Sequence, residues 1–153
     1  ILFTQSNRKL LNPSAAFSFK LLKRQPDDVE KSVTYGLNVW RLIHGKYYPF
    51  DQQKVLSLIS RALQRGFNPA GNTRQLAAIL DSPDRTAALR TLTVPSLIIH
   101  GEDDPLVLVA CGYATATAIP NAKIKVYPGM GHTIPNQLYD DITTQILDHI
   151  KLS

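Results

Sequence analysis

The sequence contains little sulfur and no long apolar segment. Its 153 residues include one cysteine and one methionine, so no disulfide can form within the chain, as is usual in a reducing compartment. No apolar run approaches the roughly 20 residues that a helix needs to cross a bilayer. We therefore expect a cytoplasmic location and no membrane partner.

Motifs for metals, phosphates and nucleic acids are also missing. There is no His and Cys cluster at zinc-ligand spacing, the acidic run at 102–104 lacks the other positions of a calcium loop, and no glycine-rich phosphate loop follows a strand. The first 70 residues are basic, with eleven Lys and Arg against four Asp and Glu. These cations are scattered, as on a solvated helix surface. We therefore expect no cofactor, no metal and no nucleic-acid partner.

The first half of the chain shows the apolar spacing of helices. Asp27 with Glu30 forms a capping-box pattern at the start of a first helix, which Gly45 ends. Asp51 begins a second helix, which stops at Gly66. Apolar residues recur at intervals of three and four in these two helices and in a shorter third one: Val29, Val33, Leu37 and Trp40; Val55, Leu58, Ile59, Ala62 and Leu63; Leu76, Ile79 and Leu80. This half is therefore predicted to be helical.

The pattern changes after residue 90. Two short apolar runs, at 94–100 and 122–127, are each followed by a glycine, as in the buried strands of a parallel sheet. Helices are predicted between them, over 106–119, and after them, over 136–151. This order predicts an α/β fold. Because two strands are few for such a sheet, we expect a missing N-terminal half or self-association to complete it.

Two loops leave the carboxyl ends of the predicted strands. Residues 101–105 bring a cluster of carboxylates, and residues 128–132 bring His132 on a glycine-flanked turn. Open α/β sheets bind their ligands beyond the carboxyl ends of their strands, so we expect both loops on one rim of the sheet. An Asp and a His on one rim are two parts of an acyl-transfer triad.

A resemblance to a known superfamily rests on three segments: VPSLIIHGEDDPLV at 94–107, AIPNA at 118–122 and GMGH at 129–132. They resemble the C-terminal half of α/β-hydrolases, above all esterases and methylesterases that act on polyketides, and their epoxide-hydrolase and haloperoxidase relatives. The resemblance implies two parts. Residues 1–71 hold the end of a core strand, at Ile1–Thr4, and a helical cap region, and residues 72–153 hold the C-terminal part of the α/β-hydrolase core.

The resemblance also implies roles for single residues. Asp104, in the pattern Gly-x-x-Asp-Pro, becomes the triad acid and His132 the general base, and the nucleophile belongs upstream on a Gly-x-Ser-x-Gly turn. That pentapeptide does not occur in these residues, and neither does an Asp nucleophile on such a turn. Trp40 and Tyr48, in segments that resemble the cap, are candidate substrate-binding residues.

Each assignment has a structural alternative. Asp104 can serve only as the cap of the next helix, or Asp103 can be the acid in its place. His132 can be an ordinary turn histidine. The aromatic residues Trp40 and Tyr48 can simply belong to a core.

The other histidines and the cysteine are predicted to be structural. His100 ends a strand and is expected beneath the loop that follows. His44 and His149 are expected on helix surfaces. Cys111 lies in an alanine-rich stretch and is expected to be a small buried thiol.

We therefore expect part of a serine hydrolase that cleaves a small ester-like substrate through an acyl-enzyme. Two alternatives remain open. The chain can be a non-catalytic binding module on a hydrolase scaffold, or it can serve epoxide-hydrolase or dehalogenase chemistry with an upstream Asp nucleophile. The residue at the upstream nucleophile position distinguishes them.

The chain by itself is predicted not to hydrolyse p-nitrophenyl esters, because the nucleophile and the oxyanion hole belong upstream. Loss of a triad member lowers the rate by orders of magnitude. A spectrophotometric assay of the purified polypeptide checks this. Robust turnover that His132→Ala abolishes would show that these residues contain an overlooked nucleophile.

Overall fold

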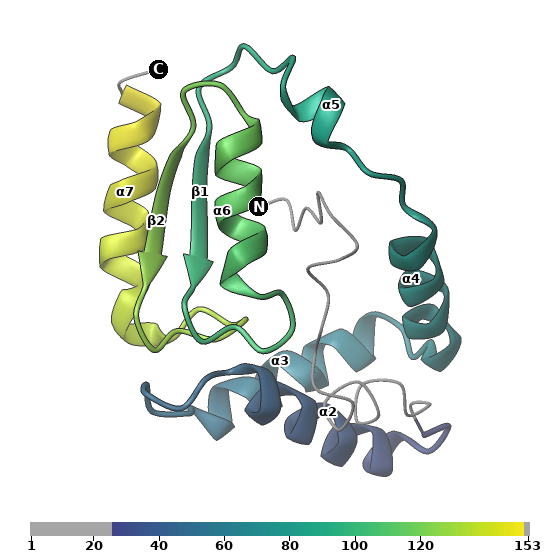
Figure 1. Ribbon diagram of the computed structural model, residues 1–153. Helices are drawn as coiled ribbons and strands as arrows, with labels where there is room; N and C mark the ends of the chain where they lie inside the picture. Colours follow the sequence, from purple (N-terminus) through teal and green to yellow (C-terminus); the bar gives the residue numbers. More distant parts are fainter. Residues whose placement is uncertain (1–25, 152–153) are drawn as a thin grey trace. The chain divides into compact units, whose positions relative to one another are not determined.

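The computed structural model describes residues 26–151 (Figure 1). The predicted strand end at Ile1–Thr4 lies outside the described residues, as do the side chains of Leu76, Ile79 and Leu80. The described chain forms two compact units: a sheet unit of residues 43–49 and 84–151, and a helical unit of residues 26–42 and 50–83. The division at residue 71 into cap and core stays a prediction.

The sheet unit has the predicted order of strands and helices. β1 (Leu97–Gly101) and β2 (Lys123–Tyr127) pair in parallel, in a register that places Ile99 opposite Lys125. α6 (Val109–Ala118) connects the strands, and α7 (Tyr139–Lys151) follows β2. Figure 1 shows α6 on one side of the two strands and α7 on the other. The helical connection allows the two strands to run in the same direction, so both end at the same rim.

Short elements and a late helix start depart from the predicted pattern. α5 (Thr86–Leu89) precedes β1, and the 3₁₀ turn η2 (Asn136–Leu138) precedes α7. α6 begins at Val109 and not at residue 106 as predicted. The Asp104 carboxylate accepts the main-chain N–H groups at the start of this segment and holds it as a turn.

Two apolar clusters stabilise the sheet unit. Their buried members are Leu89, Ala118 and Ile119 in one, and Tyr127, Met130 and Ile142 in the other. The second cluster joins β2 to α7 through Tyr127 and Ile142. The Tyr127 hydroxyl also donates to Asp141 Oδ2, in α7, at 2.6 Å. Burial raises the pKa of Tyr127, and the hydrogen bond and charge of Asp141 raise it further. The phenol therefore stays a neutral donor over the physiological range.

The far end of α7 is exposed although it carries large apolar residues. Ile142 is buried at 5% exposure, as expected for a helix that covers the sheet. Ile146, Leu147 and Ile150 are 38%, 49% and 65% exposed. Two five-residue strands offer too little surface to cover the whole apolar face of a thirteen-residue helix. The apolar face of α7 is therefore only partly covered in the described residues.

The helical unit contains three helices, as the apolar spacing predicts. They are α2 (Val29–Ile43), whose last residue belongs to the sheet unit, α3 (Gln52–Arg65) and α4 (Pro69–Asp81). Asp51 caps α3 as expected, because its Oδ1 accepts the N–H of Lys54 at 2.9 Å. Asp28, and not the predicted Asp27, accepts the N–H of Lys31 at the start of α2.

No helix within residues 26–151 combines the length and the apolar character needed to cross a lipid bilayer.

Gly101 closes β1 where no side chain fits, which predicts the effect of Gly101→Ala. A Cβ atom there would overlap the carbonyl oxygens of Met130 and Gly131, so we expect a loss of about 3 kcal/mol in the free energy of unfolding. Gly71→Ala, in α4, is the control: its Cβ meets Asn68 at an ordinary 3.6 Å, and helix propensity favours Ala by about 1 kcal/mol. Urea denaturation measures both, and equal stability of the two variants would contradict the clash.

Candidate active site

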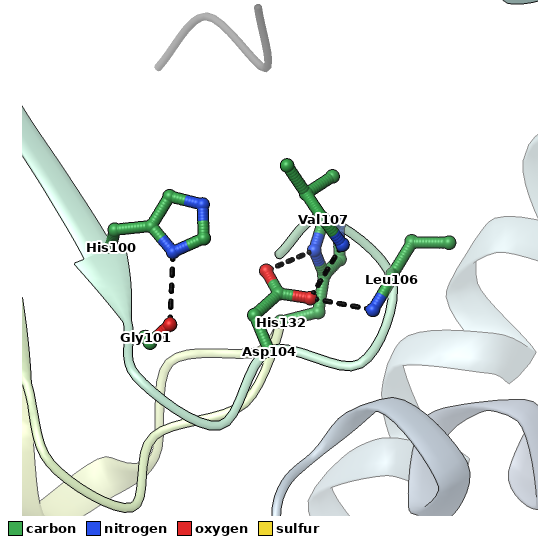
Figure 2. A network of polar contacts seen from close by, with 6 residues as sticks. All are labelled: His100, Gly101, Asp104, Leu106, Val107 and His132. Atoms are coloured by element: carbon green, nitrogen blue, oxygen red, sulfur yellow. Dashed lines mark hydrogen bonds and ion pairs between the residues drawn. The ribbon is translucent and has the colours of Figure 1, made fainter. Parts of the chain in front are cut away.

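Asp104 lies in the loop that follows β1 and is buried, with 6% of its surface exposed. One carboxylate oxygen, Oδ1, accepts the main-chain N–H groups of Leu106 at 2.8 Å and of Val107 at 2.9 Å (Figure 2). A buried carboxylate needs such donors to offset the loss of water. This oxygen therefore holds the turn that leads into α6 and leaves the second oxygen for another partner.

His132 lies in the loop that follows β2, and main-chain hydrogen bonds join this loop to that of Asp104. The N–H of Glu102 donates to the carbonyl of Tyr127 at 3.0 Å, and the N–H of Asp103 donates to the carbonyl of Met130 at 3.0 Å. The two loops therefore lie together at the rim where both strands end, as the sequence predicts.

The second oxygen of Asp104 contacts His132. Figure 2 shows the two side chains facing each other, with His132 Nδ1 2.8 Å from Asp104 Oδ2. The His132 side chain is 15% exposed, and the Asp104 side chain is 4% exposed. An ionised carboxylate can only accept, so Nδ1 carries the proton and donates. The lone pair of a neutral ring is then on Nε2, the nitrogen that a general base uses.

The geometry distinguishes the two adjacent aspartates. Asp103 is exposed, and its N–H contacts Met130, whereas the side chain of Asp104 reaches His132. The alternative that Asp104 caps the next helix is wrong, because the N-cap residue of α6 is Leu108 and no side chain caps this helix. Oδ1 of Asp104 instead holds the turn that precedes α6, while Oδ2 contacts the imidazole.

His100 has the structural position that its place at a strand end predicts. Its Nδ1 lies 2.9 Å from the carbonyl oxygen of Gly101, and its ring lies against Gly112 of α6. Figure 2 shows this ring apart from the Asp104–His132 pair.

The predicted surface position of His44 is wrong. Because α2 ends at Ile43, His44 lies in the segment that follows and is only 7% exposed. Its Nδ1 is 2.7 Å from Thr133 Oγ1, and its Nε2 is 3.2 Å from the carbonyl oxygen of Pro49. Sequence reasoning missed this residue, since its partner Thr133 lies 89 positions further along the chain. His149, also predicted on a surface, is half-buried in α7.

Cys111 is a buried thiol, as predicted, with 1% of its surface exposed. Burial raises the pKa of this thiol, and the nearby negative charge of Asp104 raises it further. Both effects oppose the thiolate that a cysteine nucleophile needs.

No group of three or more His, Cys, Asp or Glu residues in the described part of the chain could hold a metal ion.

The two candidate substrate-binding aromatics belong to different units. Trp40 is half-buried on α2 in the helical unit. Tyr48 belongs to the sheet unit, where it packs against the cluster of Tyr127, Met130 and Ile142. This packing gives Tyr48 a structural role, and substrate binding by Trp40 and Tyr48 stays a prediction.

Comparisons with known proteins support the resemblance seen in the sequence, although no protein-family model matches the chain. A non-heme haloperoxidase of Rhodococcus erythropolis is 41% identical over 69 residues, which are 44% of this chain and 25% of that protein. A rhodomycin D methylesterase of a Streptomyces species is 25% identical over 143 residues, which are 91% of this chain and 47% of that protein. The chain therefore spans half or less of the length of these relatives.

A solved esterase structure has a similar fold. The esterase EaEST from Exiguobacterium antarcticum aligns with a TM-score of 0.65 and 17% identity over 89% of this chain and 47% of its own. These likenesses confirm the predicted fold class. The chain has the C-terminal part of the α/β-hydrolase fold, and its sequence is similar to those of esterases and haloperoxidases.

The double role of Asp104 predicts different effects of two substitutions. Asp104→Asn keeps an oxygen for the N–H groups of Leu106 and Val107, whereas Asp104→Ala leaves both without their acceptor. Because an unsatisfied buried donor costs about 1–3 kcal/mol, we expect Asp104→Ala to unfold at clearly lower urea concentration than Asp104→Asn. Equal midpoints would contradict the assigned role of Oδ1.

Proposed function

We propose that this chain supplies the acid and the histidine of a serine hydrolase that cleaves carboxylic esters through an acyl-enzyme. The observation that carries the proposal is the 2.8 Å contact between His132 Nδ1 and the buried Asp104 carboxylate. The nucleophile is proposed to come from residues outside this chain, because a Gly-x-Ser-x-Gly turn does not occur in it.

The proposed reaction follows from the two nitrogens of His132. Nε2 takes the proton of the serine hydroxyl as the serine oxygen attacks the ester carbonyl, and the ring becomes an imidazolium. Asp104 stabilises that cation through Nδ1. The imidazolium then gives its proton to the alcohol that leaves, and an acyl-serine remains. A water molecule releases the acid from it by the same two proton transfers.

The name of one relative, a rhodomycin D methylesterase, supports ester chemistry over other uses of the same pair. An Asp nucleophile would attack as an ionised carboxylate and form an alkyl ester, so in epoxide-hydrolase or dehalogenase chemistry the Asp–His pair would act on the water that hydrolyses this ester. A binding module would have no nucleophile.

Substitutions in the complete native protein that contains this chain test the proposed roles. We expect His132→Ala and Asp104→Asn to lower kcat for p-nitrophenyl acetate by roughly 10³-fold or more, as for other triads. Asp103→Asn removes a neighbouring exposed carboxylate and is the matched control, with kcat expected within about twofold of wild type. Full activity of His132→Ala would refute the proposal, and equal losses at 103 and 104 would refute the assignment of the acid.

A covalent trap in the same native protein identifies the nucleophile. We expect a fluorophosphonate to label one serine that lies outside this chain and to block hydrolysis, with mass spectrometry locating the label. His132→Ala should slow the labelling strongly. An alkylated aspartate after incubation with an epoxide or haloalkane would favour the alternative chemistry. The absence of any labelled residue would favour a binding module.

A further inference from the structure

The loop that carries His132 lies on the segment of residues 43–49, which we name the support segment. We propose that His44, through this segment, is a positioning residue that holds His132 in the orientation required for the proposed reaction. The inference rests on the proposed function. His44 is not expected to touch the substrate.

Three successive loop residues are bound by the first two residues of the support segment. The N–H of Gly131 donates to the carbonyl of His44 at 3.1 Å, and the N–H of His132 donates to the carbonyl of Ile43 at 2.7 Å. The hydroxyl of Thr133 lies 2.7 Å from His44 Nδ1. The main chain of Gly131 and His132 and the side chain of Thr133 are therefore held.

The His44 ring joins the loop to the far end of the support segment. The carbonyl oxygen of Pro49, 3.2 Å from Nε2, can only accept, so Nε2 carries a proton and donates. In the neutral ring, Nδ1 is then the acceptor for the Thr133 hydroxyl. The side chain is buried, where each of these hydrogen bonds is costly to lose.

Close main-chain packing leaves the His132 loop little room to move. A Cβ atom on Gly131 would overlap the main chain of Ile43 and His44, so the two segments meet without an intervening side chain. His132 thus has two attachments: Asp104 holds its ring, and the support segment holds its main chain.

The tolerance of such a site is small. Catalytic groups need placement within about 0.5 Å, and a shift of about 1 Å can cost roughly 10²-fold in rate. The Thr133–His44 contact is the part of this attachment that side-chain substitution can change without altering Asp104 or His132. A looser loop should therefore lower kcat and leave ground-state substrate binding in place.

A matched pair of substitutions in the complete native protein tests the inference. Thr133→Val removes the hydroxyl and keeps the shape of the side chain, and Thr133→Ser keeps the hydroxyl. We expect Thr133→Val to lower kcat roughly tenfold with KM within twofold, and Thr133→Ser to restore most of kcat. Thr115→Val is the control, because it removes a buried hydroxyl that donates to a main-chain carbonyl inside α6, and it should leave kcat unchanged.

A second pair addresses His44 directly. His44→Asn can place an amide oxygen near the position of Nδ1, whereas His44→Ala offers no acceptor to Thr133. We expect His44→Asn to retain clearly more of kcat than His44→Ala. If His44→Ala fails to fold, the Thr133 pair decides the question, since its substitutions keep the ring.

Proton NMR supplies a readout that is independent of turnover. The Nδ1–H proton of His132, donated to Asp104, is expected as a downfield signal that Asp104→Asn abolishes. In Thr133→Val this signal should broaden through faster exchange with water, and in Thr115→Val it should not.

The outcomes separate the two proposals. If His132→Ala abolishes hydrolysis but Thr133→Val keeps both wild-type kcat and the sharp signal, the positioning role is refuted and the proposed function stands. A Thr133→Val variant that loses thermal stability but not kcat also refutes it, because His44 is then only structural. Full activity of His132→Ala refutes both proposals.

Discussion

A single buried carboxylate organises the rim of the sheet. Asp104 accepts two main-chain N–H groups on one oxygen and the His132 imidazole on the other. Because a buried carboxylate is stable only when donors replace water around it, the turn into α6 and the orientation of the imidazole depend on each other. The turn before α6 and the Asp–His pair are therefore parts of one arrangement.

Main-chain contacts assemble the surroundings of this carboxylate. Main-chain N–H and carbonyl groups join the loop that carries Asp104, the loop that carries His132 and the support segment. Every residue but proline offers both groups. These contacts require residues without a side chain where the segments meet, at Gly101 and Gly131. This demand explains why glycine precedes the acidic cluster and the histidine in a chain that has only eight glycines.

Much of the sheet unit could be predicted from local patterns. Apolar runs and glycines marked β1, β2 and the loops after them, and the shared direction of parallel strands brought Asp104 and His132 to one rim. The residue predicted to cap α2, Asp27, is one position too early. Asp27 and Asp28 can both cap a helix, and the choice between them depends on where the helix starts.

Other features depend on contacts that no local pattern records. His44 is buried because a loop 89 residues away covers it, and nothing in its neighbours distinguishes it from a surface histidine at a helix end. The exposure of Ile146, Leu147 and Ile150 depends on how much sheet is available for α7 to cover, which the spacing within the helix cannot reveal. Whether Trp40 and Tyr48 bind substrate likewise depends on the relative placement of the two units.

Residues 101–104, at the end of β1 and in the loop after it, include buried and exposed positions that protein engineering can treat separately. Gly101 and Asp104 are buried, whereas Glu102 and Asp103 between them are exposed and hold the neighbouring loop through their N–H groups. A library that randomises 102 and 103 to all residues except proline would thus change the surface charge beside the imidazole without altering its support. The electrostatic attraction of anionic or cationic ligands could be adjusted there by directed evolution, separately from the chemistry of the pair.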